Sequence, residues 1–562
     1  MFDLLIKNAA VYDGVSPQPI QVEVAVTDGR IAAIGAALGA ARQTIDASGL
    51  ALMPGIVDNH THYDAQITWD KTITPSPRLG VTTAVIGNCG FTIAPCRPAD
   101  RELIMKNLTQ VEGMSLEVLR QGIDWQFESI PEYLDYLDRS GCLINVAAFA
   151  GHSSIRTYVM GEAAAERAAT ADEISQMRAL MLEALDAGAI GFATSTSPAH
   201  NGHGGRPMPS RLASDDEMRQ LAGTLGEREK GLFMLTKGGH TPMDFLESLA
   251  SDTGRPVVVA ALLHNSTNPQ GVFADLDAIE AAIGRGHKMA GAISACPLTN
   301  DFTMHSPYPV EGLQAWAPAL SLTGEALKAK LADSSFRQAV RDEIAAPATF
   351  RLFNGEWDKV AIVQAASAAN ASLEQRSIAQ IAAERGADPL DTMLDIALEE
   401  SLDTVFSAVL LNSDEAAVER LLKHPASLVS LSDAGAHLTF FNDAGFGLHL
   451  LGHWSRELGA LPLGEVVRCL TSQPADLYGI KERGRLVVGN FADLLLFDPS
   501  QVGRSERYRV HDLPGGGSRL NCDPVGVHGV WVNGVRIVDQ SGALIAHPDD
   551  SLPGGLLREF AR

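Results

Sequence analysis

Apolar and polar residues alternate in short runs at both ends of the chain, a pattern typical of β-strands. Near the start, these runs are Phe2–Lys7, Gln21–Val26 and Arg30–Ile34. Near the far end, they are Arg485–Val488, Asp493–Phe497, Gly526–Val532 and Val535–Ile537. Each group is too small to bury a core alone, so we expect the two ends to pair in one small β domain. Two unrelated β-ribbons are the alternative.

Between the two ends, near-continuous apolar runs alternate with helical stretches such as Ala171–Leu185 and Asp216–Arg228. Such runs indicate strands buried on both faces of a parallel sheet. The candidate strands are Leu52–Val57, Thr82–Ile86, Leu143–Phe149, Ala189–Ala193, Phe233–Thr236, Val257–Leu263, Met289–Ala295 and Ser427–Leu431. The simplest architecture for this alternation is an α/β fold of the (β/α)₈ TIM-type barrel.

The pattern predicts two domains. Residues 1–54 and 483–562 form a composite β-sandwich, and residues 55–482 form the barrel. Two long insertions, at about 95–140 and 297–425, follow the second and seventh barrel strands. Loops at that end of a barrel build the active site, so we expect both insertions to shape a substrate pocket.

The composition of the chain limits the kinds of molecule that it is expected to bind. The 562 residues carry 44 basic and 68 acidic side chains, a net charge of 44 − 68 = −24, which argues against nucleic acid and anionic membranes as partners. The sequence has no apolar run long enough to predict a membrane span. It also has no basic leader of the kind that predicts a secretory signal. Six scattered cysteines without a C-x-x-C pair suit reduced thiols in the cytoplasm. The expected partner is a small-molecule substrate, and the sequence leaves a homo-oligomer open.

Two histidines directly follow the first barrel strand, in the segment Asp58-Asn59-His60-Thr61-His62. In an extended segment residues i and i+2 point the same way, so His60 and His62 present two imidazoles on one side. At the mouth of a barrel, this pair predicts half of a transition-metal site. Two exposed histidines placed by chance are the alternative.

Further motifs carry a resemblance to a known family. They are Gly87-Asn88-Cys89-Gly90-Phe91, Gly151-His152 with Arg156, Gly205-Arg206-Pro207, Pro209-Ser210-Arg211, Ser432-Asp433-Ala434-Gly435-Ala436-His437, and Thr471-Ser472 with Pro474-Ala475. Together with the histidine pair, they resemble the amidohydrolase superfamily and its N-acyl-D-amino-acid deacylase (D-aminoacylase) group. The resemblance runs from Leu4 to about Val538. It implies a divalent metal cofactor, foremost Zn²⁺, as one or two ions.

The resemblance assigns roles to two residues. Cys89 matches a family metal ligand that replaces the bridging carboxylated lysine found elsewhere in the superfamily; a buried structural cysteine is the alternative. Asp433 matches the catalytic aspartate, also near the metal, which takes a proton from activated water and passes it to the leaving amine. A helix N-cap is the alternative for Asp433.

The sequence departs from the family at two positions. The family has a histidine at the ends of the fifth and sixth strands, where register here places Lys237 and Ala261. His240 and His264 lie about three residues late, which displaces a strand-borne ligand by about 10 Å. We therefore favour a one-metal site held by His60, His62, Asp433 and Cys89. A bulge that returns His240 and His264 to the metal is the alternative.

Other side chains are candidates for binding substrate. Three roles are open for Lys237: it binds a substrate carboxylate, it bridges metal ions after carboxylation, or it simply extends from the strand end into solvent. Arg206 and Arg211 suit a carboxylate, with surface ion pairs as the alternative. The remaining candidates are His152, Arg156 and His437, and the Gly-rich loop holding His200 and His203 suggests a lid.

Three functions remain open from the sequence. The first is metal-dependent hydrolysis of an amide bond other than a peptide bond, foremost in N-acyl-D-amino acids. The second keeps a single metal but cuts a cyclic amide, an ester or a lactone. The third is an amidohydrolase-like scaffold without catalysis.

Overall fold

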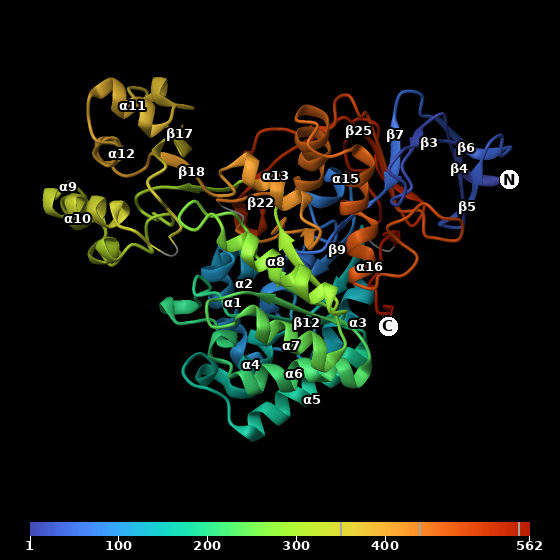
Figure 1. Cartoon of the computed structure of the whole chain (residues 1–562), viewed down its shortest axis with the longest axis horizontal. Helices are drawn as coiled ribbons and strands as arrows, with labels where there is room; N and C mark the ends of the chain where they lie inside the picture. Colours follow the sequence, from blue (N-terminus) through green and yellow to red (C-terminus); the bar gives the residue numbers. More distant parts are fainter. Residues whose placement is uncertain (349–350, 438–439, 549–550, 562) are drawn as a thin grey trace.

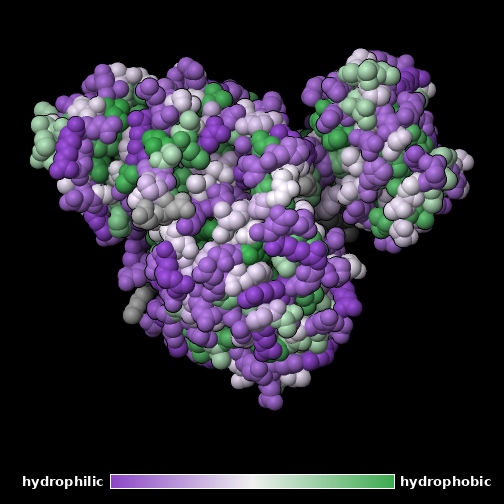
Figure 2. All heavy atoms as spheres, turned by 180° about the vertical axis from the view of Figure 1, so that it is seen from behind, coloured by the Kyte–Doolittle hydropathy of each residue, from purple (hydrophilic) through white to green (hydrophobic). Residues whose placement is uncertain are grey.

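The computed structural model describes residues 1–348, 351–437, 440–548 and 551–561. Three lobes are visible in Figure 1: a helix-rich centre, a β lobe that carries the N-terminus, and an outer lobe formed by residues 298–411. From behind, the outer lobe stands apart from the main body at its far end (Figure 2). Among the described residues, each helix is too short or too polar to cross a lipid bilayer.

Both ends of the chain contribute strands to one sheet of order β26-β25-β20-β7-β2-β3. Its strands are β2 (Ala10–Val11), β3 (Ile20–Gln21), β7 (Ala51–Pro54), β20 (Leu494–Phe497), β25 (Val527–Val532) and β26 (Val535–Val538). A second sheet, of order β5-β4-β1-β6, contains β1 (Phe2–Lys7), β4 (Glu23–Thr27), β5 (Arg30–Gly35) and β6 (Ala41–Asp46). Leu494 and Trp531 pack with Leu4 and Ile6 in one core, so the chain ends are joined by burial as well as by hydrogen bonds.

The predicted strand Arg485–Val488 is wrong, since this segment contains no strand. Leu486 is buried and its N–H donates to Asp13 O at 3.0 Å, but Val487 and Val488 are exposed. A run of β-branched residues suggested a strand, yet only one of its apolar side chains reaches the core.

The central lobe is built on parallel strands: β8 (Ile56–Asp58), β9 (Val81–Ile86), β10 (Asn145–Ala148), β11 (Ala150–Gly151), β12 (Gly191–Ser195), β13 (Leu232–Thr236), β14 (Val257–Ala260), β15 (Met289–Ile293) and β19 (Ser427–Val429). They form sheets of order β10-β9-β8 and β11-β12-β13-β14-β15-β19, and only Phe149 separates β10 from β11. A parallel bridge between Thr61 and Ala434 links the segments that follow β8 and β19. The first and last strands are therefore neighbours.

The predicted strand Leu52–Val57 is two strands that meet at Gly55. β7 belongs to the terminal sheet and β8 to the central lobe. A Cβ atom on Gly55 would lie 2.2 Å from the Thr82 side chain, so only glycine allows the chain to pass this close. An unbroken apolar run cannot reveal this bend, because both halves are buried.

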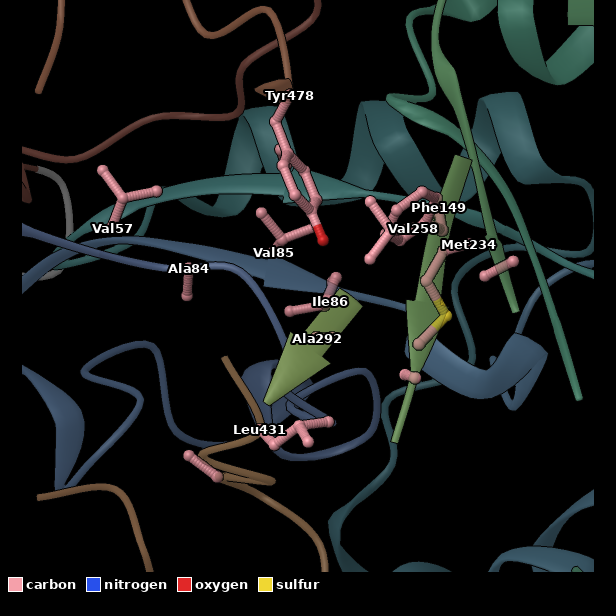
Figure 3. Packing of buried hydrophobic residues seen from close by; sticks show 14 of the residues in the cluster. Val57, Ala84, Val85, Ile86, Phe149, Met234, Val258, Ala292, Leu431 and Tyr478 are labelled. Carbon is pink, nitrogen blue, oxygen red and sulfur yellow. The ribbon is translucent and has the colours of Figure 1, made fainter. Parts of the chain in front are cut away.

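Side chains from several strands meet inside the central lobe (Figure 3). Val57, Val85 and Val258 come from β8, β9 and β14, and Tyr478 reaches in among the labelled residues. The hydroxyl of Tyr478 donates to Asn59 O at 3.3 Å. Every residue of β9, β13 and β15 is buried, which explains why these strands lack alternation.

Helices follow most of the central strands. They are α4 (His152–Met160), α5 (Ala171–Ala187), α6 (Asp215–Arg228), α7 (Met243–Thr253), α8 (Gly271–Gly284), α13 (Glu415–Lys423), α14 (Phe446–His449), α15 (Leu463–Leu470) and α16 (Ser472–Leu477). The helices predicted at Ala171–Leu185 and Asp216–Arg228 are confirmed by α5 and α6. Thr170 and Glu173 form a capping box that fixes the start of α5.

The two insertions differ in character. The first carries α1 (Arg101–Val111), α2 (Leu116–Gly122) and α3 (Ile130–Ser140), which pack on the central core. The second forms a core of its own around the antiparallel sheet β16-β18-β17. Its elements are β16 (Leu298–Phe302), α9 (Gly324–Ala332), α10 (Ser334–Ala345), β17 (Val360–Gln364), α11 (Ile378–Arg385), α12 (Pro389–Glu399) and β18 (Val405–Leu411).

A buried carboxylate ties this outer lobe together. Glu400 accepts hydrogen bonds from the Ala366 and Ser367 amides at 2.7 and 3.1 Å and from the Ser367 and Thr404 hydroxyls at 2.6 and 2.7 Å. Burial raises its pKa, but these donors outweigh burial and hold the pKa at about 2. This lies below the unfolded value of about 4.3, so its stabilisation is present above that pH and is lost as pH falls toward 2.

We therefore expect Glu400→Gln to lower the stability of the outer lobe at neutral pH by about 1–3 kcal/mol. The NH₂ group of the glutamine would face the backbone amides and hydroxyls that donate to the carboxylate, and a donor cannot accept their hydrogen bonds. The difference from wild type should shrink below about pH 4. Thermal denaturation and hydrogen exchange of residues 360–411 measure both effects. Glu399→Gln changes an exposed neighbour and is the control; equal effects of the two variants would contradict the prediction.

Candidate metal centre

The histidine pair lies where β8 ends, and its backbone is held from two sides. The Thr61 amide donates to Val85 O at 3.1 Å, and the His62 amide donates to Ala434 O at 2.8 Å. His60 and His62 are both buried, and their ring centroids lie 5.3 Å apart. Hydrogen bonds to the neighbouring strand segments therefore fix the backbone that carries both buried rings.

Cys89 follows β9 in a tight turn with a left-handed backbone (φ 57°), flanked by Gly87 and Gly90. A Cβ atom on Gly90 would lie 2.5 Å from Ala193 O, so the turn packs directly on β12. The Cys89 Sγ lies 3.6 Å from His60 Nε2 and 3.1 Å from Thr236 Oγ1. The turn thus aims the thiol at the histidine pair.

Asp433 reaches the same point from the segment that follows β19. Its Oδ1 lies 3.2 Å from His60 Nε2 and 3.5 Å from His62 Nε2. The backbone is left-handed here too (φ 45°), and the next glycine, Gly435, approaches the His62 backbone so closely that a Cβ would lie 2.7 Å from it. Left-handed residues other than glycine are costly and gather at functional sites.

The donor set fits a divalent metal ion. Ligand atoms of His60, His62 and Cys89 all lie within 4.8 Å of one another and are buried. Two imidazoles and a thiolate are the donors that zinc prefers, and the nearby Asp433 oxygen adds a carboxylate.

The charges of these groups are strongly coupled. Burial lowers the pKa of His60, but Cys89 and Asp433 outweigh burial and raise the pKa to about 9. Burial raises the pKa of Asp433 and of Cys89, but the two histidines more than compensate, so both pKa values are lowered. The Asp433 carboxylate is therefore anionic at neutral pH, and the Cys89 thiol gives up its proton more readily than an ordinary thiol.

One residue of the site was missed by the sequence reasoning. Glu112, directly after α1 in the first insertion, is buried, and its Oε1 lies 3.2 Å from His62 Nδ1. The C-terminal end of a helix favours a cation, so a glutamate directly after α1 is unusual. That was the signal available in the sequence.

A pocket opens over the cluster. Its lining is His60, His62, Cys89, Phe91, Val111, Glu112, His200, Thr236, Ala261, Leu431, Asp433 and His437. His437 was a predicted substrate residue, and its Nδ1 is buried without a partner among the described residues. His200 donates to or accepts from Ser195 Oγ at 2.6 Å and packs edge-on against Phe91.

The ends of the fifth and sixth strands present Thr236 and Ala261 to this pocket rather than histidines. Lys237 turns away and pairs with Asp275 on α8 at 2.7 Å. His240 is exposed in a turn. His264 is buried, and its amide donates to Asn412 Oδ1 at 2.8 Å. None of these last three lines the described pocket.

The other predicted substrate residues also have partners away from the cluster. His152 Nε2 lies 2.8 Å from Glu217 Oε1, and Arg156 is paired with the same fully buried carboxylate. Arg206 forms an exposed ion pair with Glu166 at 3.1 Å, and Arg211 binds Asn201 Oδ1 at 2.5 Å. Among the described lining residues, none is lysine or arginine.

Histidine, cysteine and aspartate side chains gathered at the ends of parallel strands form a candidate metal centre of the kind found in metal-dependent hydrolases. The model of the Amidohydrolase family matches residues 43–538, and the chain belongs to that family. It is 28% identical to the D-aminoacylase of Alcaligenes xylosoxydans xylosoxydans over 545 residues, which covers 95% of this chain and 94% of that one. It is 25% identical over 566 residues to the N-acyl-D-glutamate deacylase of the same organism, covering 100% and 97% of the two chains.

A solved structure of N-acyl-D-glutamate deacylase from Bordetella bronchiseptica, complexed with zinc and a phosphonate inhibitor, superimposes with a TM-score of 0.66. It is 25% identical and covers 99% of this chain and 100% of that one. The resemblance to the D-aminoacylase-like group of amidohydrolases is thereby confirmed. The predicted enzyme class, a hydrolase of carbon–nitrogen bonds other than peptide bonds, is confirmed as well.

Proposed function

We propose that this protein hydrolyses the amide bond of N-acyl-D-amino acids with a zinc ion held by His60, His62, Cys89 and Asp433. The observation that carries the proposal is the convergence of these four side chains on one buried point. Full-length similarity to enzymes named D-aminoacylase and N-acyl-D-glutamate deacylase supports the substrate class.

The bound metal would polarise the substrate carbonyl and favour deprotonation of water. Asp433 supplies the acid–base chemistry, because its carboxylate is anionic and lines the pocket beside the histidines. The Asp433 carboxylate would accept the proton from the attacking water and return it to the leaving amine. Phe91, Val111 and Leu431 line the same pocket with apolar surface, which keeps bulk water away from this transfer.

We also propose the finer architecture and setting. The parallel strand order and the Thr61–Ala434 bridge support a closed (β/α)₈ barrel over residues 55–482, with a β-sandwich built from residues 1–54 and 483–562. Thr236 and Ala261 at the fifth and sixth strand ends support a single ion rather than two. Six free, buried cysteines suit a cytoplasmic protein.

A second candidate is hydrolysis of an amide whose amine part carries no carboxylate, such as a cyclic amide. The positions of the predicted carboxylate-binding side chains favour it. Lys237, Arg206 and Arg211 each bind another protein group, and Arg156 is buried with Glu217. An uncharged substrate would need none of them.

Metal removal combined with matched substrates tests both candidates. We expect dialysis against a chelator to abolish amide hydrolysis and zinc to restore it. Protein that stays inert after addition of zinc, manganese or iron would overturn the proposal. N-acetyl-D-amino acids should react faster than their L-enantiomers and faster than the same compounds with the carboxyl group converted to a carboxamide. Preference for the carboxamides would favour the second candidate.

A further inference from the structure

The first insertion reaches the metal centre through one side chain. Glu112 directly follows α1: its amide donates to Leu108 O at 2.8 Å, and its carbonyl accepts from the His437 amide. These two hydrogen bonds fix its backbone against both the helix and the segment that carries Asp433. Only 2% of Glu112 is exposed, so its charge must be balanced by groups inside the site.

His62 offers that balance with one particular ring nitrogen. Its Nε2 faces Asp433 Oδ1 at 3.5 Å, and its Nδ1 faces Glu112 Oε1 at 3.2 Å. Both the His62 Nδ1 and the Glu112 Oε1 are buried, and neither atom has a hydrogen-bond partner among the described residues, so each is the nearest group that can satisfy the other. His62 thus faces the metal cluster with Nε2 and the first insertion with Nδ1.

We propose that Glu112 is a positioning residue that holds the proton of His62 on Nδ1 and so presents the Nε2 lone pair to the metal. A histidine ligand must be neutral, and a carboxylate at its second nitrogen selects the tautomer and fixes the ring plane. The inference rests on the metal-dependent reaction proposed above. It assigns the first insertion a role in metal binding in addition to lining the pocket.

Direct ligation by Glu112 is the competing role. The described geometry favours the indirect one, because the buried ligand cluster contains His60, His62 and Cys89, and Glu112 lies on the far nitrogen of His62. The two roles differ in what glutamine can replace. A glutamine oxygen accepts a hydrogen bond from Nδ1–H almost as well, but an uncharged amide is a poor zinc ligand.

The test measures metal affinity of the full-length protein by competition with a chromogenic zinc chelator. We expect Glu112→Ala to weaken zinc binding by about 10–100-fold, while Glu112→Gln stays within a few-fold of wild type. The cobalt-substituted protein provides a second readout, since the absorption band from the Cys89 thiolate should shift in E112A and persist in E112Q. Glu117→Gln, an exposed glutamate on α2 of the same insertion, is the matched control.

The outcomes separate this inference from the proposed function. Wild-type protein that binds no zinc or cobalt would overturn both. Wild-type-like zinc affinity in E112A would overturn only the role of Glu112. Equal losses in E112A and E112Q would replace the positioning role by direct ligation. If E112A does not fold, E112Q still decides the matter, because retained affinity with a retained cobalt band supports positioning and lost affinity overturns it.

Discussion

Replacement of Asp433 by asparagine is expected to lower kcat by about 10²–10⁴-fold, the usual contribution of a positioned general acid–base group. Asparagine matches the shape of aspartate but cannot accept the proton of the attacking water. The side chain lies 3.2 Å from His60 Nε2 and lines the pocket, so its loss acts on the reacting atoms. Steady-state kinetics on the best N-acyl substrate measure the effect, with metal content determined in parallel.

Asp216→Asn, an exposed carboxylate on α6, is the control and should leave kcat unchanged. A D433N enzyme that retains full activity would refute the acid–base role of Asp433. If zinc content also falls in D433N, activity per bound zinc separates the loss of the ligand from the loss of the proton carrier.

The histidine pair could be predicted from its spacing after a strand, and Cys89 and Asp433 could be predicted from the family resemblance of their motifs, which also follow strands. Residues at the carboxyl ends of parallel strands meet whatever the length of the segments between them. The structure brings these four side chains together as that rule requires. The same register placed Ala261 correctly, since it lines the pocket, but it was wrong by one residue on the fifth strand: Thr236 lines the pocket and Lys237 pairs with Asp275.

Glu112 could not be found this way because it belongs to an insertion. No periodicity relates the end of α1 to the strands, and only the folded path brings its carboxylate to His62. The bend at Gly55 was hidden for a similar reason: it changes the sheet to which a residue belongs without changing its burial. Sequence patterns report burial well, but they report the partner of a buried side chain poorly.

His152 and Arg156 illustrate the same limit. Their motif follows the third strand, which suggested side chains that face the pocket. Instead α4 begins at His152, and the helix turns both side chains toward Glu217 on α6. His152 Nδ1 completes the network with Thr194 Oγ1 at 2.7 Å. Arg156 and Glu217 have no exposed side-chain surface, so this network stabilises the wall behind the site.

Replacement of Glu217 by glutamine is therefore expected to destabilise the protein by about 3–5 kcal/mol, because it leaves the Arg156 guanidinium buried without its counter-charge. The remaining acceptors of Arg156, the carbonyls of Ala164 and Arg167 at 3.4 and 3.0 Å, are neutral. Chemical denaturation of metal-loaded protein measures the change. Glu166→Gln makes the same substitution in the exposed pair with Arg206 and should cost less than about 1 kcal/mol. Equal stabilities of E217Q and E166Q would contradict this prediction. They would mean that water or a rearranged side chain reaches Arg156, so that the packing between α4 and α6 adjusts to the loss of the carboxylate.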